Sequence, residues 1–384
     1  MTGPETPGRA QPGDPALPHP SSPSSSPYWS DGVDALHPYV PGEQPGTERV
    51  IKLNTNENPY GPSPRALEAI RAAATDDLRL YPDPESRVLK ALVAGPHGLS
   101  PEHVFVGNGS DEVLGLAFLA LLKRSQPILM PDVTYSFYPV YCDLFGVASR
   151  LVPLDEGLRL RVADYVAPNG GVVVANPNAP TGLSISLPEV RQLLEQNPDV
   201  PVLVDEAYVA FGGDTAVALV ADFPNLLVVR TLSKSHSLAG MRVGFAIGQP
   251  RLIEGLERVK GCFNSYPVDR VALAAAAAAL ADTAYLAVTV NAVVLSRTRL
   301  GDALGALGFS VLPSHTNFLF ACHPAKDAAQ LQLALRRRGI LVRHFARPRI
   351  DQYLRISVGT DAECDALLTA LREVLPDVPG PTKA

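Results

Sequence analysis

The sequence predicts an α/β protein, in which a mostly parallel sheet is covered by helices on both faces and a smaller α+β unit follows. From about residue 50, short runs of apolar and β-branched residues alternate with longer segments of helical periodicity. Continuous apolar strands of this kind are typical of parallel sheets that are buried on both sides. After Val271 the pattern changes to an alanine-rich stretch and then to mixed strands and helices. No linker separates the two units, so we expect them to pack side by side.

The first unit contains six apolar runs that have the length and composition of buried strands. Between them, Asp111–Leu122 and Leu187–Glu195 have the periodicity of helices. The predicted strands are Val104–Val106, Ile128–Met130, Val172–Ala175, Val202–Val204, Leu226–Val229 and Val243–Ile247.

The second unit begins with one long helix, which we expect to run from Val271 towards Leu307. The segments that follow alternate between the two kinds of periodicity, which indicates an α+β arrangement. The expected elements are strands at Thr316–Ala321, Ile340–Arg343 and Leu354–Val358, and helices at Ala325–Arg338 and Asp361–Leu375.

Composition excludes several classes of protein. The net charge is −6 and the two signs are interleaved, which argues against a nucleic-acid-binding face. The longest apolar run, Val271–Ala281, is mostly alanine and too short to span a membrane. The four cysteines (Cys142, Cys262, Cys322 and Cys364) lie far apart. We therefore expect neither a disulfide framework nor a metal site, but free thiols in a reducing cytoplasm.

Polar residues follow the ends of four predicted strands. Because the carboxyl ends of parallel strands meet at one edge of a sheet, we expect these residues to line a single cleft. They are Gly107–Glu112 after the first strand, Asn176–Gly182 after the third, Asp205–Tyr208 after the fourth, and Arg230–Lys234 with Gly240–Arg242 after the fifth.

One group of these residues suits an anion such as a phosphate. Gly109, Ser110 and Asp111 begin a helix, where free backbone N–H groups point towards a ligand. Ser233 and Arg242 flank the same strand end, and an arginine offers a forked pair of donors to phosphate oxygens. Taken singly, such a helix start is usually only an N-cap. Together these residues predict a phosphate site.

Two further residues suit a pyridine cofactor. A carboxylate such as Asp205 can keep a pyridine nitrogen protonated, which makes the ring an electron sink. Lys234 lies in a cationic pocket that we expect to exclude water in part, so it loses basicity and can form a Schiff base. The sequence therefore predicts a cleft that binds a phosphorylated pyridine aldehyde.

The order of these motifs resembles the fold-type I, class I/II pyridoxal-phosphate aminotransferases, over about residues 36 to 375. Within that class, further motifs resemble the histidinol-phosphate aminotransferases. The class motifs are N-P-N-A-P-T-G at 176–182, D-E-A-Y at 205–208, T-L-S-K at 231–234 and G-M-R-V-G-F at 240–245. The narrower motifs are L-N-T-N-E-N-P-Y-G-P-S-P at 53–64, Y-P-D at 81–83, L-V-R-H-F at 341–345 and L-R-I-S-V-G-T at 354–360.

The resemblance implies a role for each matching residue. Lys234 would carry the cofactor as a Schiff base and move the proton, Asp205 would pair with the ring nitrogen, and Tyr208 would bond the ring 3-oxygen. The other implied contacts are Tyr135 on the ring face, Ser110, Asp111, Ser233 and Arg242 around the cofactor phosphate, and Tyr81 reaching the phosphate of the neighbouring subunit in a homodimer.

The resemblance also implies how the substrate binds. Arg355 would hold the anionic end of either substrate, and Arg343 and Tyr60 would contact the phosphate of histidinol phosphate. Two arginines match the charge and the oxygens of a phosphate dianion, whereas one suffices for a carboxylate. Many family members have an asparagine immediately before P-T-G, where this chain has Ala179. Either Tyr208 alone serves the 3-oxygen or Asn178 moves into the space.

The expected activity is transamination between L-histidinol phosphate and 2-oxoglutarate in histidine biosynthesis. Alternatives on the same fold are an aromatic amino-acid aminotransferase and a decarboxylase of a phosphorylated amino acid. We expect small-molecule substrates and no nucleic-acid or membrane partner. The expected parts of the chain are a disordered, proline- and serine-rich tail at 1–35, an N-terminal part of the small domain at 36–75, the large cofactor-binding domain at 76–270 and the C-terminal small domain at 271–384.

Overall fold

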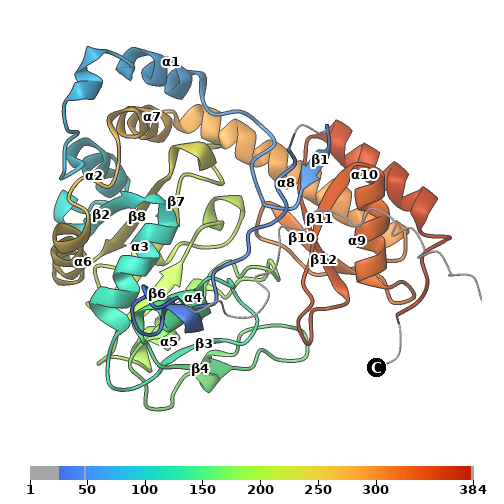
Figure 1. The fold of residues 1–384 in the computed structure, drawn as a ribbon, viewed down its shortest axis with the longest axis horizontal. Helices are drawn as coiled ribbons and strands as arrows, with labels where there is room; N and C mark the ends of the chain where they lie inside the picture. Colours follow the sequence, from blue (N-terminus) through green and yellow to red (C-terminus); the bar gives the residue numbers. More distant parts are fainter. Residues whose placement is uncertain (1–25, 47–48, 382–384) are drawn as a thin grey trace, which may run out of the picture.

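The structure, a computed structural model, describes residues 26–46 and 49–381 and contains two sheets with separate cores. Most of the predicted tail, residues 1–25, lies outside the described residues. The larger sheet has seven strands and the smaller has five, and they lie side by side (Figure 1). The chain therefore forms the two predicted units.

The larger sheet has the strand order β2-β8-β7-β6-β5-β3-β4. β8 runs antiparallel to both of its neighbours, β2 and β7, and the other six strands share one direction. The predicted mostly parallel sheet is therefore confirmed. β4 was not predicted, because it is an edge strand with three exposed residues of four. The strands are β2 (Val104–Asn108), β3 (Ile128–Pro131), β4 (Ser149–Val152), β5 (Val172–Ala175), β6 (Val202–Asp205), β7 (Leu226–Thr231) and β8 (Val243–Gly248).

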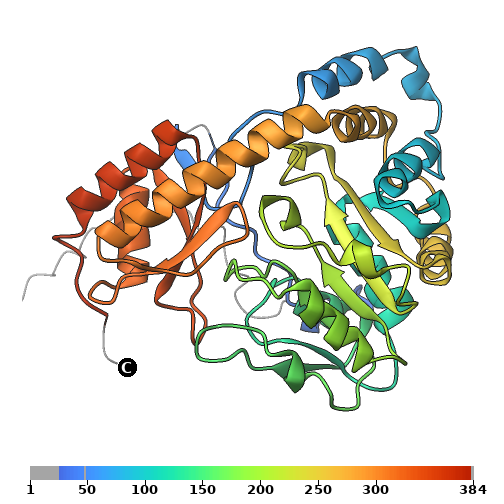
Figure 2. The same ribbon diagram turned by 180° about the vertical axis from the view of Figure 1, so that it is seen from behind.

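Helices bury both faces of this sheet because its strands are apolar on both sides. Val172 and Val174 of β5 pack into one core, whereas Val173 between them packs into another. The first face is covered by α2 (Arg87–Ala94), α5 (Leu187–Glu195) and α7 (Arg270–Ala281), and the second by α3 (Gly109–Ala117), α4 (Tyr138–Phe145) and α6 (Pro250–Phe263). α1 (Pro64–Ala73) packs on the outer side of α7 (Figures 1 and 2).

The expectation of one long helix after Val271 was wrong. The segment forms α7 and α8 (Thr283–Ala306), which are bent by 79° relative to each other. Asp282 leaves the helical conformation between them, and its carboxylate accepts a hydrogen bond from the backbone N–H of Tyr285 in the first turn of α8. Within the described residues no single helix has the length and hydropathy of a membrane span; only this bent pair, counted together, reaches them.

The smaller sheet has the strand order β1-β11-β12-β10-β9. Leu319 of β10 packs under three helices, whereas Phe318 and Phe320 point to the opposite face, towards the larger sheet. The strands are β1 (Ile51–Leu53), β9 (Ser310–Val311), β10 (Phe318–Cys322), β11 (Ile340–His344) and β12 (Tyr353–Ser357), and the helices are α8, α9 (Ala328–Arg337) and α10 (Asp361–Val374). β1 and β9 were not predicted, since each has only two or three residues.

Candidate active site

A cleft of about 1060 Å³, with the solvent at its mouth included, lies between the carboxyl ends of the larger sheet and the uncovered face of the smaller one. Predicted residues that line it are Ser110, Asp111, Tyr135, Asp205, Tyr208, Ser233, Lys234, Arg242, Arg343 and Arg355.

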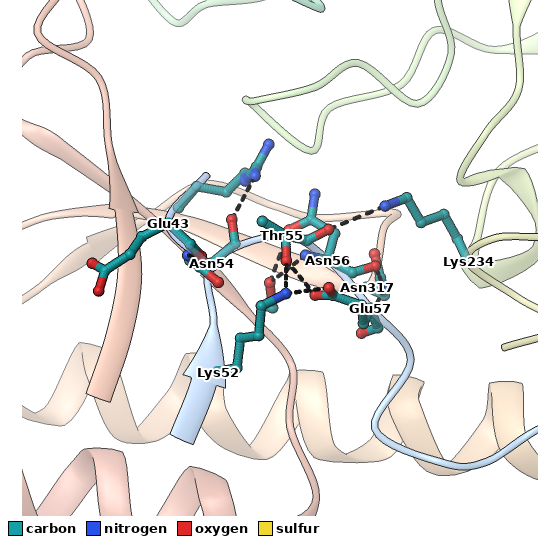
Figure 3. A network of polar contacts seen from close by, with 10 residues as sticks. Glu43, Lys52, Asn54, Thr55, Asn56, Glu57, Lys234 and Asn317 are labelled. Atoms are coloured by element: carbon teal, nitrogen blue, oxygen red, sulfur yellow. Dashed lines mark hydrogen bonds and ion pairs between the residues drawn. The ribbon is translucent and has the colours of Figure 1, made fainter. Parts of the chain in front are cut away.

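Lys234 extends into this cleft from the loop after β7. Its Nζ donates a hydrogen bond to the carbonyl oxygen of Thr55, at 3.1 Å (Figure 3). Burial lowers the pKa of Lys234 to about 8, and the nearby positive charge of Arg355 contributes to the lowering. A larger share of neutral amine is therefore present near neutral pH than for an ordinary lysine, which suits a nucleophilic amine.

Asp205 ends β6 at the floor of the cleft. Burial raises the pKa of Asp205 to about 6, and two hydrogen bonds oppose that rise. The Tyr138 hydroxyl donates to Oδ2 at 2.9 Å, and the backbone N–H of Ala207 donates to Oδ1 at 3.1 Å. These donors hold a buried carboxylate in one orientation, ready to pair with a cationic group in the cleft.

The start of α3 and the start of β8 meet at one end of the cleft. Arg242 Nη2 lies 3.1 Å from Asp111 Oδ2. Gly109 has a φ of +77°, and a Cβ there would lie 2.5 Å from Arg242 Nη2. Gly244 allows the same approach, because its Cβ would lie 2.4 Å from the backbone nitrogen of Ser110. The glycines thus bring a guanidinium group against a helix N-terminus, which is an anion-binding arrangement.

Ser233 and Tyr135 complete that end. The Thr231 hydroxyl donates to Ser233 Oγ at 2.9 Å, so the Ser233 hydroxyl hydrogen is left to point elsewhere. The Tyr135 hydroxyl donates to Asp111 Oδ1 at 3.2 Å. The Tyr135 ring lies edge to face against Tyr138, with centroids 5.5 Å apart. The Tyr135 ring is thereby held against Tyr138, whose hydroxyl bonds to the carboxylate of Asp205.

The smaller sheet contributes two arginines. Arg355 Nη2 donates to the carbonyl of Asn54 at 2.9 Å, but its buried Nε has no hydrogen-bond partner among the described residues. Burial lowers the pKa of Arg355 from its usual value, and a guanidinium remains charged even so. Arg343 donates two longer bonds, of 3.3 and 3.4 Å, to the carbonyls of Val40 and Pro41. The buried Nε of Arg355 is thus a donor that an anionic ligand would satisfy.

Four predicted residues do not line the cleft. The side chain of Asn178 is hydrogen-bonded to Thr181 in its own loop and to Val133 and Thr134 in the segment after β3. Gly109 lies behind Arg242. Tyr60 packs beside Tyr208 in an apolar cluster, and Tyr81 is 79 % exposed and stacked on Tyr266.

Other lining residues were missed by the sequence reasoning. Thr55 and Asn56 belong to the motif at 53–64, whose polar residues carried the only signal for them. Tyr39 reaches the cleft from the N-terminal segment, with its ring 4.8 Å from that of Phe137. Tyr138, the first residue of α4, was missed as well; it does not line the cleft but is buried beneath it and bonds to Asp205.

The class of protein follows from this fold and cleft together with its relatives. The family "Aminotransferase class I and II" matches residues 48–371. The chain belongs to that family.

Curated relatives narrow the comparison. The chain is 60 % identical over 350 residues to histidinol-phosphate aminotransferase 2 of Thiobacillus denitrificans, with 91 % of this chain and 98 % of the relative covered. It is 59 % identical to histidinol-phosphate aminotransferase of Gluconacetobacter diazotrophicus, with the same coverage. Among solved structures, histidinol-phosphate aminotransferase from Sinorhizobium meliloti in complex with pyridoxal-5'-phosphate superposes with a TM-score of 0.80, at 28 % identity, covering 92 % of this chain and 99 % of that one.

Proposed function

We propose that this chain transfers an amino group between L-histidinol phosphate and 2-oxoglutarate, giving imidazole acetol phosphate and L-glutamate in histidine biosynthesis. The observation that carries this proposal is the pair Arg343 and Arg355 on the cleft face of the smaller sheet, opposite Lys234. A phosphorylated amine needs more positive charge at that end than an ordinary amino acid does. The names of the relatives at 59–60 % identity support the same substrate.

Pyridoxal phosphate fits the donor set of the cleft. The start of α3, Ser233 and Arg242 would hold its phosphate, and Asp205 would pair with its ring nitrogen. When bound, the cofactor supplies an electron sink that is conjugated to the substrate amino group. Two hydrogen bonds keep Asp205 in place for this pairing, and Tyr135 supplies an aromatic face for the ring.

Lys234 would do two things in the reaction. It binds the cofactor covalently through Nζ, which requires a neutral amine, and its lowered pKa supports this role. With substrate bound, Nζ would act as the base that accepts the proton of the substrate α-carbon and then as the acid that returns it. Thr55 supports this shuttle because its carbonyl oxygen orients Nζ within the cleft.

The arginines would divide the two substrates between them. Arg355, whose buried Nε has no partner among the described residues, would bind the anionic end of histidinol phosphate and, in the other half-reaction, a carboxylate of glutamate. Arg343 would add contacts to the phosphate dianion alone, whereas Tyr60, which packs beside Tyr208 and does not line the cleft, has less support for the contact that the resemblance implies. Because both arginines contact the substrate and not the cofactor, they would determine which substrate binds and would take no part in the proton transfer.

We also propose that the enzyme is a cytoplasmic homodimer with active sites built across the interface. The exposed side chain of Tyr81 supports this arrangement, since it lies outside its own cleft and would reach the cofactor phosphate of the partner subunit. The four cysteines, all of them unpaired, suit a reducing compartment.

An amine screen tests the proposed activity. Purified protein with added pyridoxal phosphate and 2-oxoglutarate is offered histidinol phosphate, histidine, phenylalanine and tyrosine, and glutamate formation is followed. We expect histidinol phosphate to give the largest kcat/KM. A larger value for phenylalanine or tyrosine would favour the aromatic aminotransferase instead. Release of carbon dioxide from a phosphorylated amino acid without glutamate formation would favour the decarboxylase.

A further inference from the structure

Asn56 lies at the centre of a buried polar network beside the cleft, and each of its polar groups has a partner. Its backbone N–H donates to Ser357 Oγ at 2.9 Å, and its carbonyl accepts from Asn317 Nδ2 at 2.9 Å. Its side-chain Oδ1 accepts from the Ser357 hydroxyl at 2.9 Å, and its Nδ2 donates to the Tyr208 hydroxyl oxygen at 3.0 Å. Figure 3 shows Asn56 between Thr55 and Asn317, on the side of the network that faces Lys234.

The network determines which way the Asn56 amide points. Ser357 Oγ already accepts the backbone N–H of Asn56, so its own hydrogen needs an acceptor. Ser357 is buried, and Oδ1 of Asn56 is the acceptor that it has among the described residues. With Oδ1 committed to Ser357, the amide NH₂ must face Tyr208. The opposite amide orientation would leave the Ser357 hydrogen buried and unpaired, which is unfavourable.

The orientation of Asn56 in turn directs the hydroxyl hydrogen of Tyr208. Because the Tyr208 oxygen accepts from Asn56, its own hydrogen is left to donate to something else. In the described part of the chain no group accepts it, and Tyr208 lines the cleft. The phenol ring is held from its other side by Phe318, edge to face at 5.1 Å. Ala179, which packs in the same apolar cluster, offers no donor.

We propose that Asn56 is a positioning residue, which holds the Tyr208 hydroxyl as a hydrogen-bond donor towards the 3-oxygen of the bound pyridoxal ring. This inference rests on the proposed function, since it requires pyridoxal phosphate in the cleft. Asn56 acts through Tyr208 and does not itself bind the ring. With Ala179 in place of a second donor, the ring oxygen depends on this one hydroxyl and therefore on the residue that orients it.

Two independent features support a dedicated role for asparagine at this position. Asn56 has a φ of +58°, a left-handed conformation that asparagine tolerates better than most residues. Burial raises the pKa of the Tyr208 phenol, whereas the positive charge of Arg355 and the hydrogen bond from Asn56 oppose that rise. A donor that accepts a bond from an amide donates more strongly itself, because hydrogen bonds in a chain polarise one another.

The test measures the bound cofactor and not turnover. The visible absorbance of the cofactor changes as the nitrogen that joins it to Lys234 loses its proton, so a pH titration gives a midpoint. A donor to the 3-oxygen stabilises negative charge there and weakens the hold of the nitrogen on its proton. Asn56→Gly, which keeps the left-handed backbone, should therefore raise the midpoint by about one pH unit, the size expected for one hydrogen bond to a charged group. Affinity of the apoenzyme for pyridoxal phosphate should fall about tenfold.

A double-mutant cycle separates positioning from general damage. In the Tyr208→Phe background the hydroxyl is absent, so Asn56→Gly should shift the midpoint by no more than about a third of the shift in the unmodified enzyme. Ser357→Ala, which removes the hydroxyl that orients the amide and with it the acceptor of the Asn56 backbone N–H, should give a smaller rise of the same sign and serves if Asn56→Gly does not fold. Equal shifts in both backgrounds, or no shift in either, would overturn the inference. Failure of the unmodified protein to bind pyridoxal phosphate would instead overturn the proposed function.

Discussion

Arg343 of β11 and Arg355 of β12 are register partners on antiparallel strands, so their side chains leave the same face of the smaller sheet. Both guanidinium groups lie over the ring of Phe345, at 5.6 and 5.5 Å from its centroid. Like charges directly opposite each other destabilise a sheet unless something partners them. The aromatic ring and main-chain carbonyls do so in part, and a bound anion would complete the pairing.

Replacing the two arginines should therefore affect the two half-reactions differently. Arg343→Ala removes charge-assisted contacts to phosphate, worth about 1.5–3 kcal/mol, or roughly ten- to a hundredfold in affinity. It should weaken the half-reaction with histidinol phosphate and largely spare the one with glutamate, whereas Arg355→Ala should weaken both. Cofactor absorbance in single-turnover mixing measures each half-reaction. Arg337→Ala, at an exposed arginine that ends α9, is the control. Equal slowing of both half-reactions by Arg343→Ala would make Arg343 structural.

The lowered pKa of Lys234 predicts how the apoenzyme takes up its cofactor. Only the neutral amine attacks the aldehyde, so the rate of uptake should rise with pH and level off above about 8, where Lys234 is deprotonated. An ordinary lysine would still be gaining rate near pH 10. Borohydride should then fix the cofactor on the peptide that contains Lys234, and Lys234→Ala should bind it without a covalent link. A label on another lysine would refute the assignment.

Tyr138 should control the ionisation of Asp205. The Tyr138 hydroxyl donates to Asp205 Oδ2 at 2.9 Å and opposes the rise in the Asp205 pKa that burial causes. Tyr138→Phe removes a bond worth about 1.5–3 kcal/mol to a charged group, so that pKa should rise by about one to two units above about 6. At least about half of the carboxyl group would then be neutral at pH 7. Cofactor affinity should fall on acidification at a correspondingly higher pH, as fluorescence titrations can measure. An unchanged pH profile would show that the ring of Tyr138, and not its hydroxyl, matters.

Paired deletions should separate two parts of the N-terminal region. Removing residues 1–27 should cost little activity, because that stretch is rich in proline and serine and poor in apolar side chains. Removing residues 1–46 also deletes the Tyr39 ring, the two carbonyls that bind Arg343 and the ion pair between Glu43 and Arg336. Turnover with histidinol phosphate should then fall by at least about tenfold. Loss of melting temperature on the shorter deletion would show that the first residues pack on the body.

Sequence reasoning located the strands of the larger sheet because their apolar composition is a local property. The run Val172–Ala175 is a strand at the predicted residues, and the polar residues after β6 and β7 do meet in one cleft. The same reasoning extended one helix through Asp282, because alanine-rich sequence favours helix on both sides of it. The break depends on capping by Asp282 and on the packing of the two helices against different cores. The spacing of apolar residues along the sequence indicates neither of these.

The half of the cleft that comes from the smaller sheet was harder to predict. Asn56 lies 152 residues from Tyr208 along the chain, and Thr55 lies 179 residues from Lys234. No local pattern connects such pairs, since they meet only when the two units pack. Asn178 illustrates the converse: its place in a motif indicated the cofactor, whereas its side chain is hydrogen-bonded to Thr181 and to the segment after β3 and does not line the cleft.

The break at Asp282 also has a mechanical consequence. In the described part of the chain, an early crossing lies between Tyr39, which packs against Phe137 of the larger unit, and Glu43, which pairs with Arg336 of the smaller one. After it the backbone makes two further passages: the first, from the smaller sheet to the larger core, lies between β1 and α1, and the second, back again, lies between α7 and α8. The Ser63 hydroxyl, at the first passage, donates to Asp282 Oδ2 at the second, at 2.5 Å. The two connections are thus joined at one point instead of forming two separate tethers. Any relative movement of the two units would therefore act on these two connections together, through the hydrogen bond between Ser63 and Asp282.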